Sequence, residues 1–436
     1  MTEAFLHYLW QFQQFDKSNL LTVAGERISV LKTGILNTDA GPDFSHARLQ
    51  INDIEWAGNV EVHISSSDWK IHKHQENEAY NNVILHVVWH DDKPIFREDG
   101  SVIPTLELKP ISDINLLNKY QQLLDNQSVI PCESYFKEVS NLSKIGILDK
   151  VLTKRLQQKA QVVGELFEQN KGDWEETAYQ LLAKNFGFKL NSDAFLRLAQ
   201  NLPLKVLQKH RNNLTQIEAM LFGQAGMLEN VDEYSEKLSQ EYDFFATKFS
   251  LKTTQLGSHE WKFLRTRPAN FPTIRLAQLA KLITQQQSFF SLFTQTNNIE
   301  DLRNALKVEQ STYWQEHYNF GKTASKNLVG LGRDSVNNIL INTVIPLLAC
   351  YSEKTDNQEL MSRCLSFLEA LPAEKNHITE MWEGLGLEIK TSFDSQASIE
   401  LYNNFCTQKR CLACNVGVEI LRKPPHPKSL PDREGL

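Results

Sequence analysis

The sequence predicts an α+β protein, with a small N-terminal α/β domain built on a mixed sheet and a large all-α region after it. Between Arg27 and Leu108, short runs rich in β-branched and aromatic residues alternate with turn residues, as in a sheet. After Pro110 the apolar residues take up helical spacing. The chain has 436 residues, 41% of them hydrophobic, which is too long for one ordinary core, so we expect two or three domains.

The N-terminal elements follow in a definite order. Thr2 can cap a first helix. Turn residues at 39–42 and 98–100 separate the β-rich runs, and the polar stretch 65–82 has room for a short helix. The expected order is therefore a helix, three strands, a helical or irregular connection and another strand. The predicted strands cover residues 28–31, 47–51, 60–64, 83–89 and 104–108.

The region after Pro110 predicts helices almost throughout. Asp173 and Glu176 have the spacing of a capping box, and an apolar stripe precedes them. The proline-rich end cannot continue a helix and is expected to be a disordered tail. The predicted parts are an α/β domain at 1–125, a helical domain at 126–390, a cysteine-containing segment at 391–422 and a tail at 423–436.

Composition limits where the protein acts. The N-terminus lacks the pattern of a signal peptide, and no apolar run reaches the ~18 residues of a membrane span. Six cysteines in so long a chain do not indicate a disulfide framework. We therefore expect a cytoplasmic protein without a membrane partner. The net charge of −7 argues against a surface that binds nucleic acid everywhere.

One segment carries the opposite charge. Between Lys248 and Lys281 there are seven basic residues and one acid, Glu260. Aromatic residues interleave with Arg265 and Arg267, a pattern that can stack bases and pair phosphates. The same residues are equally typical of a structural loop whose arginines cap helices.

Histidines and carboxylates gather in the β-rich region. Six of the 12 histidines fall between His46 and His90, where an even spread would place about one. Glu61 and His63 alternate along a predicted strand and so share a face, and a hairpin would bring Asp43 beside Glu61. Two adjacent carboxylates suit Mg²⁺ or Mn²⁺, with His63 as a base. An ordinary half-buried strand followed by a turn would show the same sequence pattern.

Four nearby residues are candidates for substrate contact. His72 and His74 form a His-x-His pair, which can hold a transition metal and is spaced to Glu78 as in the first half of a cupin site, although the second half is absent. Alternatively these imidazoles line a substrate groove or stay unligated. The candidate substrate-binding residues here are Trp69, His72, His74 and His86.

A cysteine cluster lies near the C-terminus. The spacing Cys406-x4-Cys411-x2-Cys414 suits Zn²⁺ or an iron–sulfur cluster. A fourth ligand would have to come from elsewhere in the chain. The candidates are Cys350, Cys364 and His426. Three reduced thiols without a metal are the alternative.

The order Pro42-Asp43 and then Glu61-Val62-His63 resembles the PD-(D/E)xK nuclease superfamily. That resemblance implies a restriction-endonuclease-like domain, a divalent ion between Asp43 and Glu61, and cleavage of nucleic acid. The departure is His63, which stands where the family has lysine; histidine is largely neutral near pH 7, so general-base work becomes the expectation.

Longer stretches resemble an uncharacterised bacterial family, domain of unknown function 2851. That resemblance covers nearly the whole chain and implies no activity. The matching stretches are 40–44, 58–63, 67–69 with His72 and His74, 80–88, 223–226, 267–272, 394–397 and the three C-terminal cysteines.

The sequence therefore leaves three alternative functions. The first is a metal-dependent nuclease or related phosphodiesterase. The second is a scaffold or nucleic-acid-binding protein that kept the fold without catalysis. The third is a different metalloenzyme that uses the histidine-rich site.

Overall fold

The computed structural model describes residues 1–37, 39–229 and 231–422. The chain divides into two compact units, Met1–Ile147 with Leu401–Leu436, and Leu148–Glu400. These limits differ from the boundaries at 125 and 391 expected from the sequence, because the C-terminal segment belongs to the N-terminal unit. The predicted tail at 423–436 lies outside the described residues.

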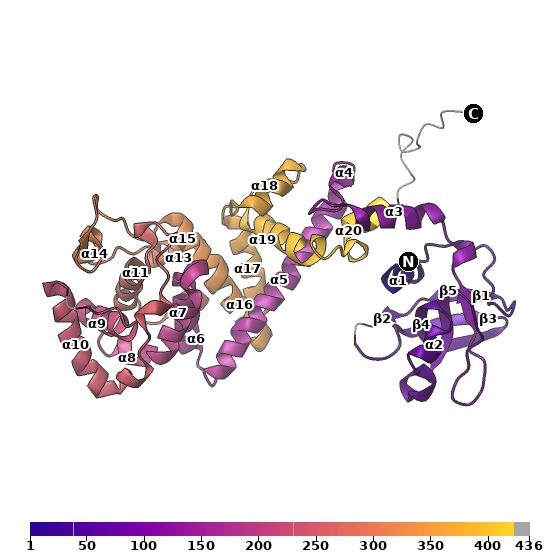
Figure 1. The fold of residues 1–436 in the computed structure, drawn as a ribbon, viewed down its shortest axis with the longest axis horizontal. Helices are drawn as coiled ribbons and strands as arrows, with labels where there is room; N and C mark the ends of the chain where they lie inside the picture. Colours follow the sequence, from indigo (N-terminus) through magenta and orange to yellow (C-terminus); the bar gives the residue numbers. More distant parts are fainter. Residues whose placement is uncertain (38, 230, 423–436) are drawn as a thin grey trace. The chain divides into compact units, whose positions relative to one another are not determined.

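A six-stranded mixed sheet forms the centre of the N-terminal unit, as predicted (Figure 1). The order is β1-β3-β4-β5-β6, with β2 paired to β3. β1, β3 and β4 are antiparallel neighbours, whereas β4, β5 and β6 run parallel. The strands are β1 (Ile28–Lys32), β2 (Ile35–Leu36), β3 (Phe44–Ile51), β4 (Ile54–Ser65), β5 (Val83–His90) and β6 (Thr105–Glu107).

Two helical segments pack on this sheet. Helix α1 (Glu3–Gln11) begins at Thr2, whose hydroxyl accepts a hydrogen bond from the Phe5 amide at 3.3 Å, and it contacts β4 and β5. The crossover from β4 to β5 contains α2 (Asp68–Ile71) and the short turns η1 (His74–Glu76) and η2 (Glu78–Tyr80). A parallel pair needs such a crossover, and the nearly continuous burial of β5 is typical of a parallel strand covered on both faces.

The C-terminal segment completes this unit. The side chain of Glu419 accepts hydrogen bonds from the amide and hydroxyl of Ser140, at 2.9 and 2.6 Å. The remaining elements of the unit are η3 (Lys109–Ile111), α3 (Ile114–Asp125), α4 (Glu133–Phe136), the beginning of α5 (Asn141–Gln169), the π-helical turn η8 (Tyr402–Cys406), η9 (Cys411–Ala413) and α20 (Asn415–Arg422).

The second unit is helical, as predicted; among its described residues the strands are the short pair β7 (His317–Asn319) and β8 (Lys322–Thr323). Its helices beyond α5 are α6 (Trp174–Phe186), α7 (Phe188–Asn201), α8 (Leu204–Gln208), α9 (Leu214–Gln224), α10 (Glu233–Phe249), α11 (Pro272–Gln285), α12 (Phe289–Gln295), α13 (Ile299–Leu306), α14 (Thr312–Glu316), α15 (Arg333–Ile339), α16 (Ile345–Thr355), α17 (Gln358–Ala370), α18 (His377–Gly384) and α19 (Ser392–Leu401).

Two details qualify the sequence-based expectations for this unit. Asp173 caps α6 by accepting from the Glu176 amide at 3.0 Å, but the Glu176 carboxylate accepts from the Leu204 amide at 2.9 Å, so tertiary packing takes the second half of the predicted capping box. The stretch Arg333–Thr355 is long and apolar enough to cross a membrane by length and composition alone, and 78% of its 18-residue window is buried inside the protein, as in a core helix.

The β4–β5 pairing depends on a close approach at Gly58. A Cβ atom there would lie 2.5 Å from Ile84 Cγ2 and 2.6 Å from the Asn82 carbonyl oxygen. Gly58→Ala should therefore lower the free energy of unfolding by about 1–3 kcal/mol, because the neighbouring backbone cannot yield without moving β5. Urea denaturation measures this change.

The matched control is Gly384→Ala, at a helical position where an added Cβ meets nothing within 4 Å. We expect this variant to be neutral or slightly stabilising. Equal stability of the two variants would contradict tight pairing at Gly58.

Candidate metal centre

The parallel register of β4 and β5 places acidic and imidazole groups on one face of the sheet. Glu61 pairs with His86 across the two strands, and His63 follows Glu61 by two residues, so all three side chains point the same way. Glu61, His63 and His86 are buried, at 4%, 2% and 0% exposure. Such burial of polar groups requires partners, and the crossover segment supplies them.

Two more imidazoles come from the crossover. Lys73 separates His72 from His74 and adopts a left-handed conformation with φ of +58°, which costs a non-glycine residue roughly 1–3 kcal/mol. This turn ends α2 and begins η1, so that both flanking histidines approach His63. Strain of this kind at a histidine pair is consistent with a functional constraint on the backbone.

Three imidazole nitrogens converge on one point. His63 Nε2 lies 3.1 Å from His72 Nδ1 and 3.3 Å from His74 Nε2. All three ligand atoms lie within 4.8 Å of one another. A tetrahedral zinc ion with bonds of about 2.0–2.1 Å separates its nitrogen ligands by roughly 3.4 Å. The spacing therefore fits one ion held by three histidines.

Glu61 lies beside this set. Its Oε1 is 3.3 Å from His74 Nε2 and 3.6 Å from His63 Nε2. Its Oε2 accepts a hydrogen bond from the Asp43 amide at 3.0 Å, and Asp43 Oδ2 accepts one from the Val62 amide at 3.0 Å. These reciprocal bonds fix the Glu61 carboxylate, with one oxygen turned toward the histidines.

His86 and Trp69 support the ligands from behind. His86 Nε2 lies 2.8 Å from His63 Nδ1, the arrangement in which a ligand histidine donates its second N–H to a neighbour and keeps Nε2 free for a metal. His86 Nδ1 is then buried without a hydrogen-bond partner among the described residues. The Trp69 indole packs edge-on against His74 and His86 at centroid distances of 5.3 and 5.5 Å.

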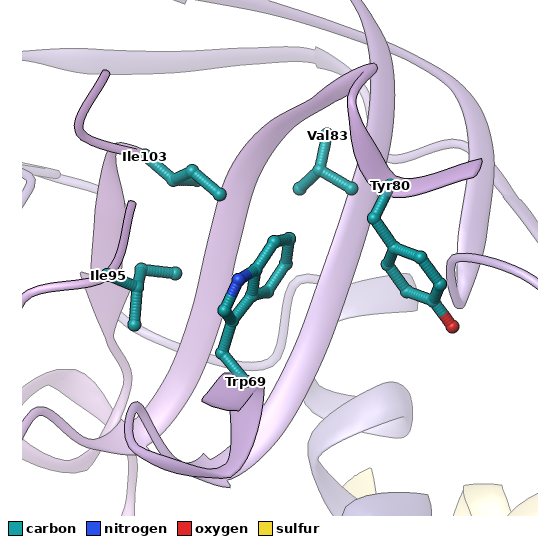
Figure 2. Packing of buried hydrophobic residues seen from close by; sticks show 5 residues of the cluster. All are labelled: Trp69, Tyr80, Val83, Ile95 and Ile103. Atoms are coloured by element: carbon teal, nitrogen blue, oxygen red, sulfur yellow. The ribbon is translucent and has the colours of Figure 1, made fainter. Parts of the chain in front are cut away.

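Figure 2 shows how Trp69 is held. Its indole lies between Ile95 and Ile103 on one side and Val83 and Tyr80 on the other. The ring of Tyr80 in turn stacks on His74 with a centroid distance of 3.9 Å. The apolar cluster therefore fixes the crossover that carries His72 and His74.

Burial shifts the pKa values of His63, His86 and Glu61. It lowers the pKa of His63 to about 4, with smaller contributions from His74 and His72, and it lowers the pKa of His86 well below the usual range. Burial also raises the pKa of Glu61, and the Asp43 carboxylate raises it further. Neutral imidazoles keep the lone pairs that a metal ion requires.

The predicted residues divide into three groups. Asp43, Glu61, His63, His72 and His74 come together. Trp69 and His86 are buried, at 1% and 0% exposure, and lie behind the other residues of the site, so their contact with substrate stays a prediction. His46 is exposed, and His90 is exposed beside Glu107 at 3.1 Å, so neither belongs to the cluster.

Asp43 lies near the histidines, and its carboxylate contacts two groups of the protein. Asp43 Oδ2 accepts a hydrogen bond from the Val62 amide and also lies 3.2 Å from His7 Nε2. His7, on α1, was not among the predicted site residues. Its position on the first helix gave no local signal in the sequence, because the contact arises only when α1 packs on β4.

The basic segment belongs to the other unit. Arg265 and Arg267 are exposed there. Trp261 is buried and donates from Nε1 to the Ala225 carbonyl at 2.8 Å, and the buried Arg275 bonds to Gln278 at 2.8 Å. Trp261 and Arg275 thus have structural contacts within this unit, whereas Arg265 and Arg267 remain predicted contacts to nucleic acid.

The three C-terminal cysteines are all buried in the N-terminal unit. Cys406 ends η8, Cys411 begins η9 and Cys414 follows it. They lie on elements separate from the sheet face that carries the histidines.

Comparison with known proteins identifies the family. A family model described as "Protein of unknown function (DUF2851)" matches residues 3–377, and the chain belongs to that family. No curated protein and no solved structure matches the chain.

Replacing His63 with lysine separates the histidine site from a nuclease-like pair of carboxylates. An ammonium group has no lone pair for a metal, so His63→Lys should weaken zinc binding by more than about 100-fold, beyond the effect of losing a second-shell contact. Zinc titration by calorimetry measures the change. His90→Lys, at an exposed histidine outside the cluster, should bind as the parent does.

Two outcomes for His63→Lys would contradict a zinc site at the three histidines. If His63→Lys keeps the zinc affinity of the parent, the three histidines do not hold the ion. If it instead gains Mg²⁺-dependent cleavage of nucleic acid, the lysine pattern of the nucleases would apply.

Proposed function

We propose that the protein is a metal-dependent hydrolase of phosphodiester bonds, with a zinc-type ion held by His63, His72 and His74. The observation that carries the proposal is the convergence of these three nitrogens within 4.8 Å of one another. Three imidazoles with a vacant fourth position are typical of catalytic zinc sites. This is the histidine-rich metalloenzyme of the three functions expected from the sequence.

The chemistry divides between the ion and Glu61. A zinc ion lowers the pKa of a bound water and polarises the phosphoryl oxygen. Glu61, with its raised pKa and one oxygen facing the histidines, is placed to accept the proton of the attacking water. As the water oxygen bonds to phosphorus, the ester P–O bond breaks, and the departing oxygen takes up the proton that Glu61 accepted.

The substrate class rests on a different observation. The order of a helix, antiparallel strands, a crossover and a parallel strand supports a resemblance to the restriction-endonuclease-like fold. On that resemblance, Pro42-Asp43 and Glu61-Val62-His63 would take the positions of its acidic motif. This order favours nucleic acid as the substrate, with the exposed His72 at the solvent-facing edge of the site and with Arg265 and Arg267 as candidate phosphate contacts. The donor set favours a zinc-type ion over the Mg²⁺ or Mn²⁺ expected from the sequence.

Two variants should separate metal binding from catalysis. Glu61→Gln keeps the shape of the side chain but cannot accept the proton, so it should retain zinc and lose about 10²–10⁴-fold in hydrolysis of single-stranded DNA or RNA. His72→Ala removes a ligand and should lose both zinc and activity. Elemental analysis and a cleavage assay at several zinc concentrations measure the two effects.

His90→Ala is the matched control and should behave as the parent. If zinc-loaded parent protein binds nucleic acid but never cleaves it, the non-catalytic scaffold is the correct function. If His72→Ala keeps both zinc and activity, the site is elsewhere.

A further inference from the structure

Four of the six cysteines lie in the N-terminal unit. Cys132 immediately precedes α4, far along the chain from the three cysteines at 406–414. Each of the four is buried, at 8% or 9% exposure. All six cysteines fall within the described residues, and none of them forms a disulfide. A set of buried thiols from two distant segments therefore needs a physical reason.

The two segments are tied together beside Cys132. The Lys409 ammonium donates to the backbone carbonyls of Leu124 and Asn126, the latter at 3.2 Å. The Asn126 side chain donates to the carbonyl of Pro131, the residue before Cys132, at 2.8 Å. The loop that carries Cys132 is thus fixed against the loop between Cys406 and Cys411.

Helix α20 closes the other side of the set. It packs on α3 and η9. A Cβ atom at Gly417 would lie 2.2 Å from the Cys411 carbonyl oxygen, so the helix approaches the cysteine turn as closely as a glycine allows. This packing keeps Cys411 and Cys414 directed into the unit.

The thiols are close enough to affect one another. Burial raises the pKa of Cys132 to about 12, and the Cys414 and Cys411 thiols raise it further. Burial likewise raises the pKa of Cys406, with contributions from Cys132, Cys414 and Cys411. Buried thiols of this kind are poor nucleophiles. A bound metal would supply the positive charge that lets them ionise together.

We propose that Cys132, Cys406, Cys411 and Cys414 bind an iron–sulfur cluster, with Cys132 as the ligand that the C-terminal segment lacks. The local spacing Cys-x4-Cys-x2-Cys is that of plant-type iron–sulfur proteins, although there the distant fourth cysteine follows the three and here Cys132 precedes them. Cys132 is the fourth cysteine of the N-terminal unit, whereas the sequence candidates Cys350 and Cys364 belong to the helical unit and His426 lies outside the described residues.

The cysteine sulfurs do not form the compact set that a single zinc ion requires. Zinc with bonds of about 2.3 Å holds its sulfur ligands roughly 4 Å apart. Among the described residues, the set of His, Cys, Asp and Glu ligand atoms that all lie within 4.8 Å of one another consists of the three histidines, and the cysteine sulfurs form no such set. A cluster of several iron and sulfide atoms needs the wider separation.

The cluster would act as a covalent cross-link between two segments of the chain. Four thiols would release their protons and bond to iron, linking the loop before α4 to the segment that begins at Leu401. Because the closed loop spans most of the chain, its effect on the unfolded state is large in entropic terms. This proposal is independent of the hydrolase site, since no residue is shared.

The first test is whether the parent protein contains an iron–sulfur cluster. The full chain, purified without oxygen, should contain iron and acid-labile sulfide in matching amounts and show the visible absorption of a thiolate-bound cluster. After alkylation and mass spectrometry, Cys132, Cys406, Cys411 and Cys414 should be protected in the cluster-loaded protein and modified after chelation of the iron. Stoichiometric zinc without sulfide, or neither metal after reconstitution with iron and sulfide, would overturn the proposal.

Variants then identify the fourth ligand. Cys132→Ser should lose most of the iron and sulfide, whereas Cys364→Ser and Cys350→Ser should keep both. If Cys132→Ser does not fold, the protection pattern of the parent still answers the question. Full iron and sulfide content in Cys132→Ser, or an unprotected Cys132 in the loaded parent, would contradict the assignment.

Discussion

The parallel register between β4 and β5 determines what the N-terminal unit can do. It sets Glu61 opposite His86 and places His63 on the same face, inside the unit rather than at its surface. A shift of one residue would turn these side chains to the opposite face, so the site can form only in this register. The close approach of the two strands at Gly58 favours that register, and the reciprocal hydrogen bonds between Asp43 and β4 fix the Glu61 carboxylate.

Burying the imidazoles of His63, His74 and His86 beside a carboxylate has a cost that a bound cation would offset in part. His86 Nδ1 has no hydrogen-bond partner among the described residues, so the groups of the site do not satisfy one another fully. The left-handed Lys73 adds backbone strain at the same place. The apolar cluster around Trp69 stabilises the crossover against these costs, which explains why an aromatic residue next to the histidines is buried instead of lining a groove.

The sequence predicted the architecture better than the chemistry. Periodicity located the sheet strands and the change to helices, because burial patterns repeat locally along each element. Strand alternation also placed Glu61 and His63 on one face, and the expected hairpin placed Asp43 beside Glu61. The role of His72 and His74 as partners of His63 depends on the crossover geometry at Lys73, and the contact of His7 with Asp43 depends on helix packing. Neither leaves a local pattern. Cys132 was missed for the same reason, since its nearness to the C-terminal cysteines exists only in three dimensions.

A crystal of the protein grown with zinc would test the central claim most directly, through the anomalous scattering of the ion. We expect a peak bonded to His63 Nε2, His72 Nδ1 and His74 Nε2, with Glu61 Oε1 next to its remaining position. A peak between the Asp43 and Glu61 carboxylates that makes no bond to the histidines, or no peak on this face of the sheet, would contradict the account.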